Sequence, residues 1–320
     1  MTSKYFLKYT IIISTLSLVL IGYINYQLDI YGLFENRNTE NIRVFYNEHK
    51  SKSLMMYNYV PQNFNTLLLG PSLSANINTK EFRDEKIYNG SVMAHNISDM
   101  VFFAKIVLER ETKIKNIIIC LDPYIIKDHG TKNSGSSDDI SYYSALGSMD
   151  IFKSYLVEFI RQNEFYPSKY PKNNYNNFGY NNFNLRKKWQ TKTSEIISEK
   201  IKQRDIRQIS FDSIAINELS NLVNSLRERK INIYAYHTPI PESVFEFQKE
   251  KYQEFRKITN SIFSDKELII DFNHIRYKDF VLNYDNFIDH GHLSEQGQKF
   301  VLKEIILAIR KIKDSNAIEG

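Results

Sequence analysis

Short apolar runs that alternate with helix-patterned segments recur from residue 64 onward, and this alternation is the feature that most limits the fold. The apolar runs cover residues 65–70, 86–92, 115–122, 232–241 and 267–272, and helical spacing covers residues 98–111, 211–229, 242–263 and 294–313. A strand covered by helices on both faces is apolar throughout, because neither face meets water. The pattern therefore predicts a three-layer α/β domain with a mainly parallel sheet, in which the very apolar run 115–122 is central.

A second feature is the uncharged segment Tyr9–Tyr26, which holds 18 residues and reads YTIIISTLSLVLIGYINY. As a helix it would be about 27 Å long at about 1.5 Å per residue, enough to cross a bilayer core. Lys4 and Lys8 precede the segment, and Asp29 and Glu35 follow it. Because positive charge favours the cytoplasmic side, we expect the N-terminus inside and the rest of the chain outside the cell membrane.

Two other interpretations of this segment remain open. A cleaved signal peptide would need a small-x-small cleavage site, but Tyr23, Asn25, Tyr26 and Gln27 end the segment and follow it. A buried helix of a soluble domain is the other alternative. Tyrosines at both ends of the segment are typical of the aromatic belts of membrane helices, which favours one uncleaved transmembrane helix.

The chain divides into segments of different composition. We expect residues 1–28 to form a cytoplasmic tip and the transmembrane anchor, and the polar residues 29–63 to form a juxtamembrane stalk. Residues 64–314 would form the α/β domain, and residues 315–320 a tail. The stretch 127–190 is too long for one crossover between strands, so we interpret it as an insertion.

The end of this insertion, residues 169–192, is rich in basic and aromatic residues and has no acidic residue. Its six aromatic residues are Tyr170, Tyr175, Phe178, Tyr180, Phe183 and Trp189. Long ordered loops often act as lids or binding loops, and aromatic faces could stack on sugar rings. The alternative is a polar surface loop whose aromatic residues cover the edge of the domain.

Polar residues at the predicted carboxyl ends of the strands form the candidate site, because sites in open α/β sheets lie beyond these ends. Ser72 follows the first strand, in Gly70-Pro71-Ser72, and Asp289 and His292 lie just before the last helix. A serine at a strand-to-helix turn can act as a nucleophile, with a histidine as base and a carboxylate to orient it. Alone, the turn could be a simple helix cap and Asp-x-x-His a local hydrogen bond. Their order and placement together favour a triad.

The segment IDHGHLSEQGQKFV, which contains Asp289 and His292, resembles the last sequence block of the SGNH (GDSL-like) hydrolase superfamily. With the serine turn, the resemblance covers roughly residues 64–313. It implies a flavodoxin-like, SGNH-type fold with Ser72 as nucleophile, His292 as base and Asp289 as its partner. Among relatives, the chain looks most like membrane-anchored bacterial members that resemble partners of membrane-bound O-acyltransferases in cell-surface polysaccharide modification.

Three positions depart from the pattern of this superfamily. Pro71 replaces the aspartate of GDSL, and Ala94 aligns with a glycine whose backbone N–H binds the oxyanion together with that of Ser72. Asp122 aligns with an asparagine that donates a further hydrogen bond, which an ionised aspartate cannot do. We therefore expect Asp122 to turn away, for example to cap the segment after Pro123, and the alternative is that it stays protonated.

Weaker signals come from other side chains near the strand ends. Tyr124, His95 and Trp189 are weak substrate-binding candidates, and a single histidine such as His95 is more often structural. His290 could be a second base, or a metal ligand with the neighbouring Asp-x-x-His pair. Because no fourth ligand is evident and the superfamily needs none, we expect no metal and no cofactor.

Composition narrows the classes of function. A single cysteine, Cys120, excludes an internal disulfide and a cysteine-based metal cluster, and its apolar run predicts a buried core position. A net charge of +5 without a long basic tract argues against nucleic-acid binding.

The candidate triad, the apolar N-terminal segment and the resemblance to SGNH hydrolases together predict a serine acyl esterase or O-acyltransferase that acts on a cell-surface glycan or glycolipid. It would be held by one helix in the bacterial cytoplasmic membrane, with its catalytic domain outside the cytoplasm, and a membrane-bound O-acyltransferase is a candidate partner. The alternative, from another class, is a non-catalytic glycan-binding or scaffold protein that keeps the fold.

Overall fold

A five-stranded, all-parallel sheet forms the centre of the computed structural model, which describes residues 3–34, 48–127, 145–167, 176–182, 192–206 and 208–319. The strands are β1 (Thr66–Leu69), β2 (Ile87–Asn89), β3 (Asn116–Leu121), β4 (Asn232–His237) and β5 (Leu268–Asp271). Their order across the sheet is β2-β1-β3-β4-β5, and every neighbouring pair is parallel. The predicted α/β class and the central position of the run 115–122 are therefore confirmed.

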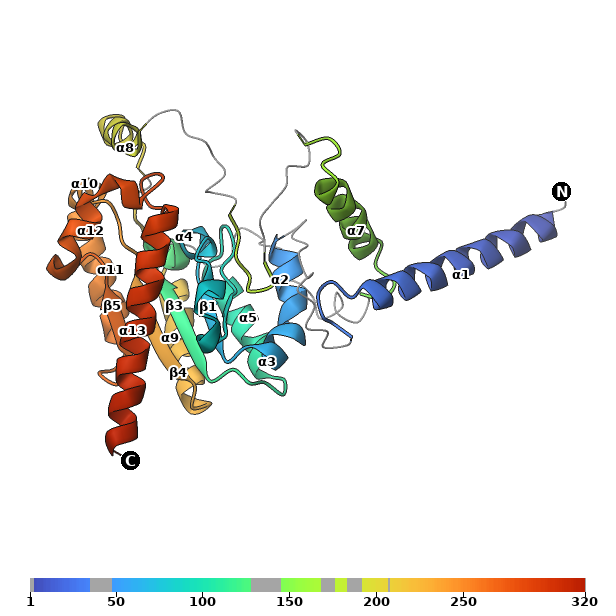
Figure 1. Ribbon diagram of the computed structural model, residues 1–320, viewed down its shortest axis with the longest axis horizontal. Coiled ribbons are helices and arrows are strands. Elements are labelled where there is room, and N and C mark those ends of the chain that lie inside the picture. The colour runs from blue at the N-terminus through green and yellow to red at the C-terminus, as the bar shows by residue number, and fades with distance from the viewer. Residues whose placement is uncertain are drawn as a thin grey trace.

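Helices cover both faces of this sheet, as Figure 1 shows. One face carries α2 (Glu48–Met56), α3 (Tyr59–Asn63), α5 (Ile97–Leu108), α9 (Ser213–Glu228) and α11 (Lys249–Ile262). The other face carries α12 (Lys278–Leu282) and α13 (Glu295–Glu319). The remaining elements are α1 (Ser3–Leu28), α4 (Ser72–Ala75), η1 (Thr79–Glu85), η2 (Pro123–Ile126), α7 (Met149–Gln162), α8 (Thr193–Lys202), α10 (Glu242–Phe247), η3 (Ile275–Tyr277) and η4 (Tyr284–Asn286).

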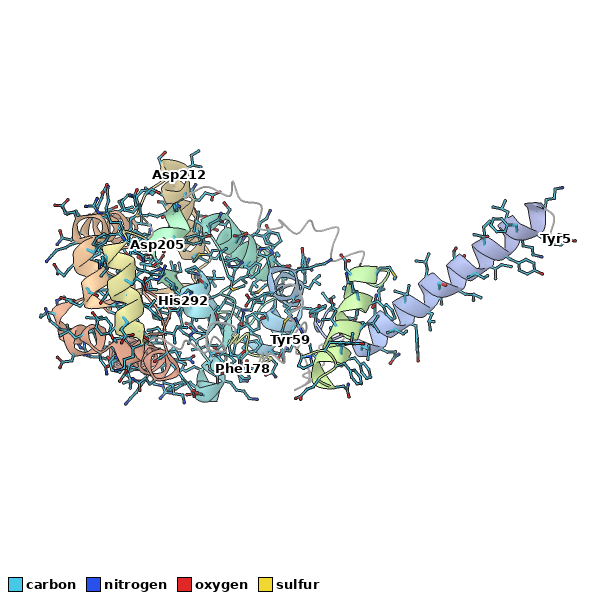
Figure 2. All side chains as sticks on the ribbon, turned by 90° about the horizontal axis from the view of Figure 1, so that it is seen from above. Tyr5, Tyr59, Phe178, Asp205, Asp212 and His292 are labelled. Carbon is cyan, nitrogen blue, oxygen red and sulfur yellow. The ribbon has the colours of Figure 1, made fainter. Side chains whose placement is uncertain are left out.

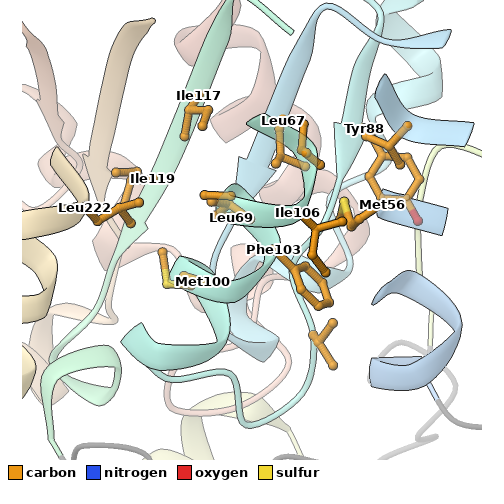
Figure 3. Close-up of a cluster of buried hydrophobic side chains, with 14 of the residues drawn as sticks. Met56, Leu67, Leu69, Tyr88, Met100, Phe103, Ile106, Ile117, Ile119 and Leu222 are labelled. Atoms are coloured by element: carbon orange, nitrogen blue, oxygen red, sulfur yellow. The ribbon is translucent and has the colours of Figure 1, made fainter. Parts of the chain in front are cut away.

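The core is divided by the alternation of side chains along each strand. On β3, Ile117 and Ile119 point to the α5 side, whereas Ile118 and Cys120 point to the α13 side. Figure 3 shows the first of these clusters, in which helix residues such as Phe103 pack on the strand residues. Each such side chain contributes about 1.5–3 kcal/mol when fully buried, which explains why both faces of this strand must be covered. Cys120 lies in the core as expected, and burial raises its pKa to about 12.

Residues 48–63 differ from the stalk that the sequence predicts. They form α2 and α3, and Leu54, Met55 and Met56 are fully buried in the core on the α5 side. Lys52 is also fully buried, where its ammonium group pairs with Glu48 at 3.1 Å. The segment looks polar because buried charges that neutralise each other inside the fold are indistinguishable in sequence from solvated ones.

Two predicted helices have different boundaries in the structure. The helix expected from residue 98 begins at Ile97, and Asn96 caps it in a reciprocal pair with Asp99. The helical stretch 242–263 is divided into α10 and α11, which are separated at Gln248.

Helix α1 extends away from the α/β domain (Figure 1), and no residue of its most apolar window is buried. It has a mean hydropathy of 1.8 and is long and apolar enough to span a membrane, as the sequence predicts. At its end, Asn25 is fully buried, and its side-chain amide donates hydrogen bonds to the backbone oxygens of Ala145, Leu146 and Ser148. These bonds attach α1 to the segment that leads into α7.

Only residues 176–182 and 192 of the basic and aromatic segment 169–192 belong to the described part of the chain, and Trp189 lies outside it. Phe178 packs edge-on against Phe64, with ring centroids 5.2 Å apart, and its backbone oxygen accepts a bond from the N–H of Asn89 at 2.8 Å. At Gly179, where φ is +81°, a Cβ atom would overlap the backbone of Asn89. This part of the segment therefore covers the edge strand β2, as in the alternative interpretation.

Candidate active site

Ser72 stands at the first position of α4, directly after β1. The turn between them needs Gly70, since a Cβ atom there would overlap the hydroxyl of Ser74 and the side chain of Cys120. Pro71 has extended backbone, which ends the strand and starts the short helix. The Ser72 side chain is half-buried at the carboxyl end of the sheet, where the sequence predicts the site.

The loop before α13 brings a histidine and a carboxylate to this serine. The Nε2 atom of His292 lies 3.0 Å from the Oγ atom of Ser72, and its Nδ1 atom lies 2.9 Å from Oδ2 of Asp289. Figure 2 shows His292 within the domain, far from the N-terminal end of α1. The three side chains that the sequence predicts as a triad thus form one hydrogen-bonded chain, and their catalytic role stays a prediction.

Asp289 also fixes the shape of its own loop. Its Oδ1 atom accepts hydrogen bonds from the backbone N–H groups of Gly291 at 2.9 Å and His292 at 2.8 Å. Burial alone would raise the pKa of Asp289, but the hydrogen bonds and the charge of His292 outweigh it and lower this pKa to about 2. The carboxylate is therefore ionised at neutral pH and accepts the Nδ1–H bond that leaves Nε2 free to accept the serine proton.

Two buried asparagines, which sequence reasoning missed, connect the parts of the site. The side-chain amide of Asn76 donates to the backbone oxygen of Leu293 at 2.7 Å, which joins the serine turn to the histidine loop. Asn89 donates to the backbone oxygens of Ser74 at 2.8 Å and Ile77 at 3.0 Å. For Asn89 the only signal in the sequence is a polar residue at the end of a predicted strand, which many surface residues share, and Asn76 has no such signal.

Ala94 has φ of +61°. A non-glycine residue in this left-handed region costs about 1–2 kcal/mol, and such strain is concentrated at functional sites. The hydroxyl of Tyr124 donates to the backbone oxygen of Ala94 at 3.4 Å. Ala94 and Tyr124 both line the cavity beside Ser72.

Asp122 lies at the end of β3 and caps η2. Its Oδ1 atom accepts a hydrogen bond from the backbone N–H of Tyr124 at 2.9 Å, and its Oδ2 atom accepts one from the Thr238 hydroxyl at 3.2 Å. This is the capping arrangement that the sequence analysis favours for the segment after Pro123. In this arrangement both carboxyl oxygens of Asp122 act as acceptors.

A cavity of about 260 Å³ opens beside Ser72 and His292. Its apolar part is formed by Ile206, Ile240 and Val244, and further lining residues include Lys127, Gln208, Ser210 and Tyr252. A cavity of this size with one reactive edge can hold a small acyl group, whereas a polymer would have to lie across its mouth.

His290 and His95 occupy different places relative to this cavity. His290 lines it, and burial lowers the pKa of its imidazole. His95 is fully buried against Phe103, with ring centroids 4.7 Å apart, so it is not available to contact a substrate. Burial lowers the pKa of His95 to about 3, which keeps its ring neutral. The structural alternative for His95 therefore fits this position, and the substrate-binding one does not.

One group of side chains in the described part of the chain has the composition of a metal site. The candidate ligand atoms of His49, His95 and Asp99 lie within 4.8 Å of one another, away from the Ser72 cavity. Asp99 already serves in the helix cap of α5 and lies 3.3 Å from Nε2 of His49. The side chain of His49 is 13% exposed.

Comparisons with known proteins add little to this geometry. No protein-family model matches the chain, and no curated protein is similar to it. Among solved structures, the chain is similar to one whose description names a platelet activating factor from Streptococcus pneumonia. The two chains are 10% identical, the match covers 78% of this chain and 86% of the other, and the TM-score is 0.41.

Proposed function

We propose that the protein is a membrane-anchored serine acyl esterase or O-acyltransferase of the SGNH type. The observation that carries this proposal is the hydrogen-bonded chain from Ser72 through His292 to Asp289. Serine is a weak nucleophile at its ordinary pKa, and a histidine oriented by a buried carboxylate is the usual means of activating it. The resemblance of the serine turn and the Asp-x-x-His segment to SGNH hydrolases supports the same chemistry.

In the proposed reaction, Oγ of Ser72 attacks the carbonyl carbon of an ester while Nε2 of His292 takes the serine proton. The backbone N–H groups of Ser72 and Ala94 are the candidate donors to the oxyanion. Collapse of the tetrahedral intermediate breaks the ester bond, and the protonated His292 gives its proton to the leaving alcohol. A water molecule or a sugar hydroxyl then attacks the acyl-enzyme, with His292 again as base, and restores Ser72.

Asp122 bears on this proposal because its carboxyl group lines the same cavity. Its two oxygens are occupied by Tyr124 and Thr238, so it contributes no donor to the oxyanion. Stabilisation of the transition state would then depend on backbone N–H groups alone, which still supply much of the effect in serine enzymes.

We infer the substrate class from chemistry and location together. The cavity suits a small acyl group, and α1 would keep the site close to a membrane surface. A cell-surface glycan or glycolipid that carries esters fits both conditions, with the domain outside the cytoplasm. A membrane-bound O-acyltransferase that delivers the acyl group is the proposed partner.

A fluorophosphonate probe on the full-length protein tests the nucleophile. We expect the wild-type protein to be labelled and the Ser72→Ala variant not to be. Ser210→Ala is the matched control, because Ser210 is an exposed serine that lines the same cavity and should leave the labelling unchanged. Labelling that persists in Ser72→Ala would assign the reactive serine elsewhere.

A non-catalytic glycan-binding or scaffold protein is the second candidate. The carboxylate of Asp122 and the strained Ala94 favour it, because both occupy positions where active relatives have a donor or a glycine. If the folded wild-type protein does not react with the probe at any pH between 6 and 9, this second function becomes the better one.

A further inference from the structure

Helix α7 turns its apolar side away from the domain to which it is attached. Its inner face consists of Ile151, Ser154 and Val157, all buried. The residues on the opposite side, at helical spacing, are Met149, Phe152, Leu156, Phe159 and Ile160. Of these, Met149, Leu156 and Phe159 are among the most exposed large apolar side chains of the described chain. An amphipathic helix in water normally has the reverse orientation.

Hydrogen bonds attach α7 to the end of α1. Just before α7, the backbone oxygens of Leu146 and Ser148 accept hydrogen bonds from the Asn25 side chain at 2.6 and 3.2 Å. The Tyr155 hydroxyl, from within α7, donates to the backbone oxygen of Asn25 at 3.4 Å. Asn25 lies at the end of the apolar run of α1, so α7 starts where a spanning α1 would leave the hydrocarbon core.

The direction of α7 differs from that of α1. Figure 1 shows α7 running across the end of α1 and not along it. If α1 crosses a bilayer, a helix that crosses its end lies near the plane of the membrane surface. Exposed aromatic residues occur on both helices and just after α7, namely Tyr23, Tyr26, Phe159, Phe165 and Tyr166. Such rings are enriched where membrane and water meet.

The geometry points to α7 as an in-plane membrane helix, whose outward apolar face lies in the boundary between lipid headgroups and acyl chains. Helices of this kind bind a bilayer by burying one apolar side about 5–10 Å into that boundary. Lipid is the occupant that this position favours, because hydrogen bonds attach α7 to the end of the apolar run of α1. This contact would give the domain a second attachment and a defined orientation on the membrane. It does not depend on the catalytic proposal.

Lipid-borne quenching in vesicles tests this contact with the full-length chain. A bimane label is placed at Leu156→Cys and, as the matched control, at Leu307→Cys on α13, since both leucines are 50% exposed. Tyr23→Cys on α1 serves as the reference for a lipid-facing site. Cys120 is buried, and the labelled wild-type protein measures its background. The vesicles contain either a lipid with a nitroxide near the headgroup or, in the aqueous phase, iodide.

We expect the lipid quencher to act on the label at residue 156 within about twofold of its effect at residue 23, and to have little effect at residue 307. A label at 156 that only iodide reaches would place α7 in water and overturn the proposal. A label at 156 that is shielded from both quenchers would mean that another copy of the chain covers α7, which also overturns it. Absence of lipid quenching at 23 would remove α1 from the bilayer, and the proposal with it.

A charge on the outward face should weaken the contact. We expect Phe159→Glu to reduce lipid quenching at Leu156→Cys several-fold, while Phe247→Glu, at an exposed phenylalanine on α10, leaves it unchanged. Equal quenching in both variants would show that α7 does not bind lipid through this face.

Discussion

Two loops meet at the candidate active site, and they are held in different ways. The loop 289–292 is held by its own atoms, since Asp289 accepts hydrogen bonds from two backbone N–H groups within three residues. The loop 90–95, which carries Ala94, is held from α2, about forty residues earlier in the chain. There Lys52 donates to the backbone oxygen of Ser91, and Glu48 accepts from the N–H of Met93 at 3.4 Å.

This difference determines which substitutions can disrupt each loop of the candidate active site. A locally held loop keeps its shape as long as its few residues remain, whereas a loop held from a distance depends on the docking of another segment. Helix α2 is the next described helix after α1. The loop 90–95 therefore depends on a segment that lies close in sequence to the apolar N-terminal helix.

The largest effect should come from the histidine of the locally held loop. We expect His292→Ala to lower turnover of a small acetyl ester by at least about 10²–10⁴-fold, because the serine loses its general base. His290→Ala is the control, since His290 lines the cavity without a bond to Ser72 among the described residues, and it should retain most activity. Steady-state kinetics on the purified full-length protein would measure both. Inactivation by His290→Ala with a mild effect of His292→Ala would show that the base is misassigned.

A substitution at Lys52 removes one of the contacts by which α2 holds the loop 90–95. We expect Lys52→Met to destabilise the protein by about 3–5 kcal/mol, because it leaves the buried carboxylate of Glu48 without its partner. Lys50→Met, on the same helix, is the matched control. Its ion pair with Asp150 is largely exposed, so the change should be within about 1 kcal/mol.

Chemical unfolding in detergent micelles measures this pair of variants. A Lys52→Met protein as stable as Lys50→Met would mean that α2 does not hold the loop 90–95 through this charge.

The pH dependence of stability tests how much Asp289 stabilises the loop 289–292 and the folded protein. The pKa of Asp289 is lowered to about 2 in the folded protein and is near 4 when unfolded. The resulting stabilisation, about 2 kcal/mol, is present above pH 4 and is lost as the pH falls toward 2, because the unfolded state then binds the proton more readily. Asp289→Asn should therefore flatten the loss of stability between pH 5 and pH 2.5.

Asp285→Asn, an exposed change in the adjacent turn, should keep the wild-type slope. Unfolding free energies at five pH values would decide this prediction. It fails when Asp289→Asn and the wild-type protein lose stability in parallel over this range.

The smallest effect is expected at Ala94. Because its φ is +61°, Ala94→Gly should relieve about 1–2 kcal/mol of strain, less about 0.5–1 kcal/mol for the added freedom of glycine in the unfolded chain. A net gain of about 0–1.5 kcal/mol with unchanged or higher turnover is expected. The same exchange at Ala104, inside α5, should instead cost about 1 kcal/mol. A loss of stability in Ala94→Gly would show that the left-handed conformation at Ala94 costs nothing.

Much of the fold follows from patterns within single segments. The strand 115–122 is central because it is apolar on both faces, and α1 is long and apolar by composition alone. The approach of His292 to Ser72 was also predictable, since the serine turn follows a parallel strand and the Asp-x-x-His segment lies in the loop just before the last helix.

The sheet, the apolar N-terminal helix and the residues of the candidate triad can be predicted from the amino-acid sequence, because each depends on spacing within a few residues. The burial of residues 48–63 in the core and the contacts from α2 to the loop around Ala94 are seen only in the folded chain. The outward orientation of the apolar side of α7 is likewise seen only there. These features depend on which polar groups meet across long stretches of chain, and no local pattern records whether a lysine such as Lys52 is solvated or buried against a carboxylate.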